Sequence, residues 1–255
     1  MIEECIVKTL AEYIGYIEKF SPEFSLSRGQ SEDRELLPSA YRLDSNGLRI
    51  YSNKDVQLFL EDFKTNSSLY IENALSYKEN DWLIHAQHFG VPTCLLDFTY
   101  SPLVALMFAV EKAFEYDNTD EKNAVVWLLN PELCNKENIN KNSILNMSDI
   151  SIDSLKTYKK PFVVTARKNN TRMVAQNGLF VYFNNNSSSL ETIEKSHLFL
   201  KKILIPHNEA RFILRSLYVL GMRFNDLYPE LSSVSKDIIL KNKVMESYKQ
   251  EENNE

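Results

Sequence analysis

Apolar residues recur every three or four positions in residues 4–20, where Leu10, Tyr13 and Ile17 fall on one face. This spacing predicts an amphipathic helix. Residues 54–79 repeat the spacing and predict a second helix. A helix or turn is expected at residues 81–90, and further helices at residues 101–115, 208–220 and from residue 232 onwards.

Short apolar runs bounded by turn residues predict strands. They lie at residues 24–28, 93–98, 124–129, 162–165, 179–183 and 198–206. Helices flank these strands throughout the chain. This order favours the α+β class, in the form of a single domain with a central mixed or antiparallel sheet flanked by helices.

The domain is expected to span residues 1–255, with its core at about residues 24–235. Residues 1–20 would then be a helical segment beside the core, and residues 250–255 a frayed acidic tail. Residues 131–156 are rich in Asn, Lys and Ser. We therefore expect this stretch to leave the core as an excursion.

Polar residues are threaded through the otherwise apolar stretch from residue 85 to residue 111. They are Gln87, His88, Asp97, Thr99 and Ser101. A buried polar group without a partner costs about 1–3 kcal/mol, so residues of this kind need partners. Such a cluster predicts a site, without saying which kind.

Two interpretations of this cluster remain open. Asp97 could orient the His88 imidazole for general acid–base chemistry, with Gln87 beside them. Alternatively, the three side chains could form a satisfied buried network that fixes the strand. Ser101, followed by Pro102, is typical of a helix N-cap, and the same helix end could also meet an anion.

Arginines and glycines outside this stretch supply further candidates. Arg28 could bind a phosphate or carboxylate, or it could form a surface ion pair with Glu32 or Asp33. Gly29 indicates a tight turn or a close approach of the backbone. Arg42 is either a second anion contact or a solvated surface residue.

The composition narrows the class of partner. Thirty-five acidic and twenty-nine basic residues give a net charge of −6, which argues against a broad nucleic-acid surface but allows a local basic groove. No signal peptide and no membrane-spanning run is expected. The three cysteines are widely spaced and odd in number, which favours reduced thiols in the cytoplasm and no metal site.

Three islands of sequence resemble the FRG domain, a mostly bacterial family. They are Ser27-Arg28-Gly29-Gln30 with Leu37-Pro38-Ser39-Ala40-Tyr41-Arg42, then residues 85–111, and then Arg172 to Phe180 with Gln176 and Gly178. The segment Leu227-Tyr228-Pro229-Glu230-Leu231 is also similar to the family's pattern. The chain departs from it at Ser27, Cys94 and Phe98, where the family commonly has an aromatic residue, arginine and tryptophan. The resemblance runs from about residue 24 to residue 235.

A remoter similarity to ADP-ribosyltransferases implies NAD as the substrate, and an ADP-ribosyltransferase-like fold. By that similarity Arg28 would hold the pyrophosphate, and Thr99 with Ser101 the ribose. Taken together with the polar cluster and the FRG islands, the candidate catalytic residues are His88, Asp97 and Gln176. The candidate ligand-binding residues are Arg28, Gly29, Gln30, Arg42, Gln87, Thr99, Ser101 and Arg172. The chain departs from those enzymes at Lys201-Lys202, where they commonly have a glutamate.

Two functions follow from these resemblances. The first is an NAD-using transferase or glycohydrolase acting as a bacterial toxin or phage-defence effector, with a protein or nucleic acid as acceptor. The second is a non-catalytic module that recognises a nucleotide, a nucleic acid or a protein partner through the same pocket. The missing glutamate favours the second, and the density of polar residues between Gln87 and Ser101 favours the first.

Overall fold

The computed structural model describes all residues except 72–75, 117–120, 167–174, 176–177, 186 and 253–255. Its strands form one sheet in the order β1-β8-β4-β2-β3-β7-β6-β5. Their bounds are β1 Glu3–Ile6, β2 Leu26–Gln30, β3 Leu95–Thr99, β4 Asn123–Leu129, β5 Leu145–Asn146, β6 Phe162–Thr165, β7 Gly178–Tyr182 and β8 Leu200–Pro206. The β1–β8 and β5–β6 pairs are parallel and the others antiparallel. The prediction of a mixed sheet is confirmed.

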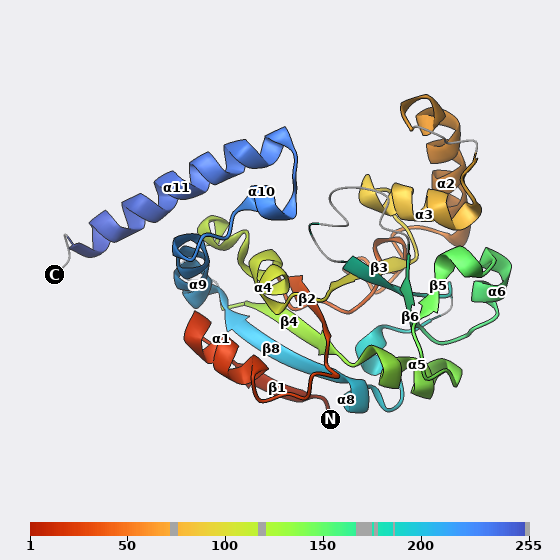
Figure 1. Cartoon of the computed structure of the whole chain (residues 1–255), viewed down its shortest axis with the longest axis horizontal. Helices are drawn as coiled ribbons and strands as arrows, with labels where there is room; N and C mark the ends of the chain where they lie inside the picture. The colour runs from red at the N-terminus through yellow and green to blue at the C-terminus, as the bar shows by residue number, and fades with distance from the viewer. Residues whose placement is uncertain (72–75, 117–120, 167–174, 176–177, 186, 253–255) are drawn as a thin grey trace.

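Helices pack against this sheet (Figure 1). Their bounds are α1 Leu10–Ile17, α2 Asn53–Ser67, α3 Glu79–His88, α4 Pro102–Val110, α5 Pro131–Ile139, α6 Ile152–Lys156, α8 Ser196–Phe199, α9 His207–Val219, α10 Phe224–Leu227 and α11 Leu231–Glu252. Short 3-10 turns lie at η1 Ser39–Tyr41, η2 Ser68–Tyr70, η4 Ala113–Glu115, η5 Met147–Asp149 and η6 Leu190–Thr192. In the part of the chain that the structure describes, no helix combines the length and the apolar character that crossing a membrane requires.

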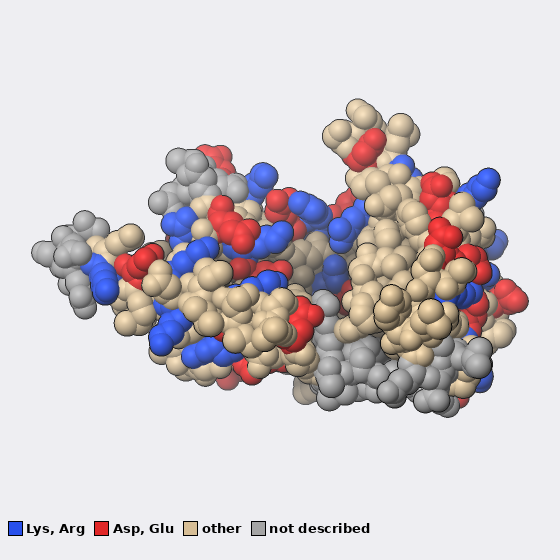
Figure 2. All heavy atoms as spheres, turned by 90° about the horizontal axis from the view of Figure 1, so that it is seen from above, with Lys and Arg blue, Asp and Glu red and all other residues tan. Residues whose placement is uncertain are grey.

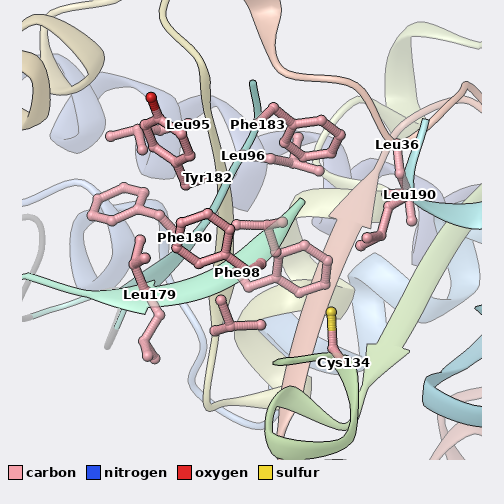
Figure 3. Packing of buried hydrophobic residues seen from close by; sticks show 14 of the residues in the cluster. Leu36, Leu95, Leu96, Phe98, Cys134, Leu179, Phe180, Tyr182, Phe183 and Leu190 are labelled. Carbon is pink, nitrogen blue, oxygen red and sulfur yellow. The ribbon is translucent and has the colours of Figure 1, made fainter. Parts of the chain in front are cut away.

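Two hydrophobic clusters lie on opposite faces of the sheet, as the central strand β4 shows. Val125 and Trp127 belong to one cluster, and Ala124 and Val126 to the other. Because successive side chains of a strand point to opposite faces, β4 is apolar throughout. Figure 3 shows part of the first cluster, in which side chains from β3 and β7 pack together. The second cluster packs β4 and β8 against α1, α4, α9 and α11.

The prediction of one helix over residues 4–20 is wrong at its start. Residues Glu3–Ile6 form the edge strand β1, and α1 begins only at Leu10, where the Thr9 hydroxyl accepts a hydrogen bond from the Glu12 N–H at 3.1 Å. Pairing with β8 overrides the helical spacing, and Ile6 is left 63% exposed. Similarly, the helix expected over residues 54–79 ends at Ser67.

The prediction that residues 131–156 leave the core is also wrong. Cys134 and Leu155 are completely buried in the first cluster. The buried Asn135 side chain donates to the Val163 carbonyl at 2.9 Å and accepts from the Val163 N–H at 2.6 Å. The Asn135 amide thus makes the two hydrogen bonds to the Val163 backbone that a neighbouring strand would make. For this reason a polar residue of this segment can lie inside the core.

Helix α4 lies directly on strand β2 at Gly29. A Cβ atom at this position would stand 1.8 Å from the Ala105 carbonyl oxygen and 2.7 Å from the Ala109 nitrogen. The expected close backbone approach is therefore confirmed, and its partner is a helix. Ser101 caps α4 as predicted, since its hydroxyl accepts from the Val104 N–H at 3.3 Å.

We expect Gly29→Ala to lower the free energy of unfolding by about 3 kcal/mol or more, because neither backbone can yield to the new methyl group. Chemical denaturation followed by circular dichroism measures the change. The matched control is Gly15→Ala in α1, where a Cβ meets no atom within 4 Å and alanine favours the helix by about 0.5–1 kcal/mol. If Gly29→Ala, like Gly15→Ala, did not lower the free energy of unfolding, the close packing of α4 on β2 would be contradicted.

His85 in α3 is the group expected to make stability depend on pH. It is 7% exposed, and neither ring nitrogen hydrogen-bonds within the described part of the chain. Burial lowers the pKa of His85 from an ordinary value of about 6.5. As pH falls from about 7 to 5, the unfolded chain binds a proton that the folded chain resists, so the free energy of unfolding should fall.

Denaturation at several pH values tests this expectation. His85→Leu should flatten the pH dependence in this range, because it removes the buried titrating group. The exposed His197 provides the control, and His197→Gln should keep the slope of the unaltered protein. An unchanged slope in His85→Leu would assign the effect to other groups.

Candidate functional site

The sheet divides between strands β2 and β3. Strand β2 pairs with β4 at all five of its residues, whereas its pairing with β3 is confined to Ser27 opposite Thr99. Beyond this pair the two strands separate, and a cleft of about 1070 Å³ lies at the opening. Figure 2 looks into this hollow and shows Lys and Arg side chains on its walls, close to Asp and Glu.

Eight of the eleven predicted site residues line the cleft. They are Arg28, Gly29, Gln30, Arg42, Gln87, His88, Asp97 and Thr99. Ser101 is not among the lining residues, and Arg172 and Gln176 lie outside the described residues. The fold thus brings together two sequence islands that are about 60 residues apart.

Arg28 spans the opening between the two strands. Its Nη1 donates to the Asp97 carbonyl oxygen at 2.7 Å, and its Nε donates to Gln30 Oε1 at 3.0 Å. Burial lowers the Arg28 pKa to about 10, with Arg42 adding to the effect and Asp97 opposing it. The guanidinium therefore stays charged at neutral pH. Its hydrogen bond to the Asp97 carbonyl takes the place of backbone pairing between β2 and β3, which is confined to Ser27 and Thr99. Neither expected ion pair, with Glu32 or Asp33, is formed.

Arg42 is the second cation of the cleft. Its side chain is exposed, and no hydrogen bond or ion pair holds its guanidinium within the described part of the chain. Partial desolvation by the surrounding cleft lowers the Arg42 pKa, and the charge of Arg34 adds to the effect. Arg34 itself pairs with Glu32 at 2.6 Å. The charge of Arg42 in turn contributes to the lowered pKa of Arg28, so these two cations repel each other, and a bound anion would relieve that repulsion.

Gln87 fixes the acidic side chain of the cleft. Its Nε2 donates to Asp97 Oδ2 at 2.6 Å, and its Oε1 accepts from the Thr93 hydroxyl. Both ends of the amide are used, so α3 is tied to β3 and the Asp97 carboxylate is held at the cleft wall. His88 also lines the cleft and packs edge-on against Phe89. The orientation of His88 by Asp97 stays a prediction.

The hydroxyls of Thr99 and Ser101 accept hydrogen bonds from backbone N–H groups. The Thr99 side chain is 3% exposed, and its hydroxyl accepts from the Ser101 N–H at 3.1 Å. The Ser101 hydroxyl caps α4. Contact of these two hydroxyls with a ribose stays a prediction.

Three of the lining residues that were not among the predicted site residues lie close together. Phe108, Glu111 and Tyr228 line the cleft, and the Tyr228 hydroxyl donates to Glu111 Oε2 at 3.3 Å. Burial raises the Glu111 pKa. The sequence signal was weak, because Glu111 lies near the end of an ordinary apolar helix and Tyr228 follows 117 residues later.

The lysines at the position where a transferase glutamate was sought have structural partners. Lys202 pairs with Asp33 at 2.8 Å and with Glu4 at 3.6 Å. Its ammonium lies 5.2 Å from the centre of the Trp127 ring. Elsewhere in the described residues, His, Cys, Asp and Glu side chains do not gather in any group of three that could hold a metal ion.

We expect Arg28→Ala to lower the free energy of unfolding by about 1.5–3 kcal/mol, because the Asp97 carbonyl loses the charged donor that joins β3 to β2. Arg34→Ala is the control. Its side chain is 63% exposed and pairs with Glu32 two residues away, and such surface pairs contribute about 1 kcal/mol or less. Equal losses in the two variants, measured by chemical denaturation, would argue against the bridging role of Arg28.

Comparison with known families gives one match. Residues 25–118 match the family model of the FRG domain, whereas the comparisons with curated proteins and with solved structures give none. The matched residues contain β2, α2, α3, β3 and α4. The resemblance expected as far as residue 235 is thus found over a shorter stretch. The part of the chain that supplies Arg28, Arg42, Gln87, His88 and Asp97 to the cleft is the part that matches the FRG domain family.

Proposed function

We propose that the cleft binds a nucleotide-like small molecule whose phosphate groups lie between Arg28 and Arg42. The observation that carries this proposal is the Arg42 guanidinium, which has no hydrogen-bond or ion-pair partner among the described residues and lies with the charged Arg28 in a large cleft. Guanidinium groups offer planar, paired N–H donors that suit phosphate oxygens. The repulsion between the two cations is unfavourable in the free protein. A phosphate group between them attracts both, and the relief of the repulsion favours binding.

The finer proposal is that this ligand is NAD. A cleft of about 1070 Å³ is at the upper end of small-molecule pockets, of roughly 300–1,000 Å³, and so suits a dinucleotide. Beyond Ser27, the edge of β2 that does not pair with β4 offers backbone groups to a ligand. Backbone donors and acceptors at such an edge are available for hydrogen bonds.

In a transferase, bound NAD supplies a ribose carbon whose bond to the nicotinamide nitrogen breaks as the acceptor's nucleophile bonds to that carbon. The bonding electron pair leaves with the nicotinamide. In this proposal His88 takes the proton of the acceptor, and the Asp97 carboxylate stabilises the charged imidazole. An effector of the toxin or phage-defence type would use such a reaction.

A non-catalytic recognition module is the second candidate. It is favoured by Lys202, which lies where the transferase resemblance would need a glutamate and which is paired with Asp33. Such a module would use the same arginines to hold a nucleotide without breaking a bond. The two candidates share the binding step and differ in whether nicotinamide is released.

Calorimetric titration with NAD tests the binding step. We expect the unaltered protein to bind NAD and Arg42→Ala to bind it at least about tenfold more weakly, because a charged hydrogen bond contributes about 1.5–3 kcal/mol. The melting temperature of Arg42→Ala should change little, since its guanidinium holds no partner within the described residues. Arg215→Ala is the control, because Arg215 lies at Phe212 and Tyr248, away from the cleft.

The outcomes separate the candidates. Binding that is lost in Arg42→Ala and kept in Arg215→Ala supports the nucleotide site. If nicotinamide is then released with time, the transferase or glycohydrolase candidate holds, and if it is not, the recognition module does. An absence of binding at millimolar NAD would exclude both forms of the NAD proposal.

A further inference from the structure

One wall of the cleft combines two aromatic rings with a carboxylate. Phe108 and Glu111 lie at the end of α4, and Tyr228 follows α10. The Phe108 and Tyr228 rings meet edge to face, with centroids 5.7 Å apart. Since the Tyr228 hydroxyl donates to Glu111, the three side chains form one unit, which we call the aromatic–acidic corner.

Glu111 occupies a position that is unfavourable for an anion. It is the C-cap residue of α4, where the helix presents the negative end of its dipole and a cation is preferred. It is half-buried, and no Lys or Arg of the described chain forms an ion pair with it. Burial raises its pKa. A carboxylate held in this way lacks the cationic partner that would offset its desolvation.

The aromatic rings strengthen the preference for a cation, because the face of an aromatic ring attracts positive charge. Tyr228 already shows this behaviour, since the Lys236 ammonium lies 5.3 Å from its ring centre. Lys236 is not among the residues that line the cleft, whereas Lys112 is. Both charges act on Glu111 without forming an ion pair with it.

We propose that Phe108, Glu111 and Tyr228 form a subsite for a cationic nitrogen group of the ligand whose phosphates Arg28 and Arg42 hold. This inference rests on the proposed function and adds to it a preference for charge. A ligand with an anionic and a cationic part would then contact Arg28 and Arg42 with the first part and Glu111 with the second. The oxidised nicotinamide ring of NAD carries a positive charge, whereas the reduced ring of NADH carries none.

Calorimetric titration with three probes tests the subsite. The probes are oxidised NAD, NADH, and ADP-ribose, which lacks the nicotinamide ring. We expect the unaltered protein to bind oxidised NAD about tenfold more tightly than NADH or ADP-ribose, because only the first carries the cationic ring. Glu111→Gln keeps the size of the side chain, and it should bring the affinities for NAD and NADH to within about twofold of each other.

Two further variants make the test specific. Glu115→Gln is the control, since Glu115 is an exposed acid four residues further along that does not line the cleft. It should leave the preference unchanged. Phe108→Leu should reduce the preference for oxidised NAD while it keeps an apolar side chain at the wall. It serves as the second test if Glu111→Gln lowers the melting temperature.

The outcomes distinguish this inference from the proposed function. If all three probes bind with equal affinity and lose it in Arg42→Ala, the phosphate site stands and the cationic subsite is overturned. If none of the probes binds, both proposals fail. A preference for oxidised NAD that is lost in Glu111→Gln and kept in Glu115→Gln supports the subsite.

Discussion

The hydrogen bond from Arg28 to the Asp97 carbonyl joins two halves of a sheet that strand pairing alone does not hold together. Strand β2 is fully paired with β4 but meets β3 at a single residue pair. A charged donor replaces the missing pairing, and the space left beside it becomes the cleft. The cleft therefore arises from the separation of two strands of the sheet, and the side chain that bridges them also lines it.

Gly29 adds a second constraint next to the first. Because it has no side chain, α4 can rest on the backbone of β2, and the end of that helix reaches the cleft with Phe108 and Glu111. Two adjacent residues of one short strand thus shape the cleft in different ways. Arg28 bridges β2 and β3, and Gly29 lets the helix that carries Phe108 and Glu111 come near.

The sequence predicted those features that depend on local patterns. Buried strands such as β4 and β6 are continuous apolar runs, and polar residues inside an apolar stretch indicated four residues that line the cleft, Gln87, His88, Asp97 and Thr99. Features that depend on distant partners were missed. Asn135 enters the core because its amide pairs with Val163, and Glu111 gains its environment from Tyr228. No spacing within either segment carries that information, because each partner lies far along the chain.

The position of β1 bears on how the chain folds. This edge strand pairs in parallel with β8, and the ion pair between Glu3 and Lys201 joins residues 198 positions apart. Contacts of such sequence separation form late, because a long loop must close first. Since β1 precedes β8 in the chain, it stays without its sheet partner while the nearly 200 residues between the two strands are synthesised.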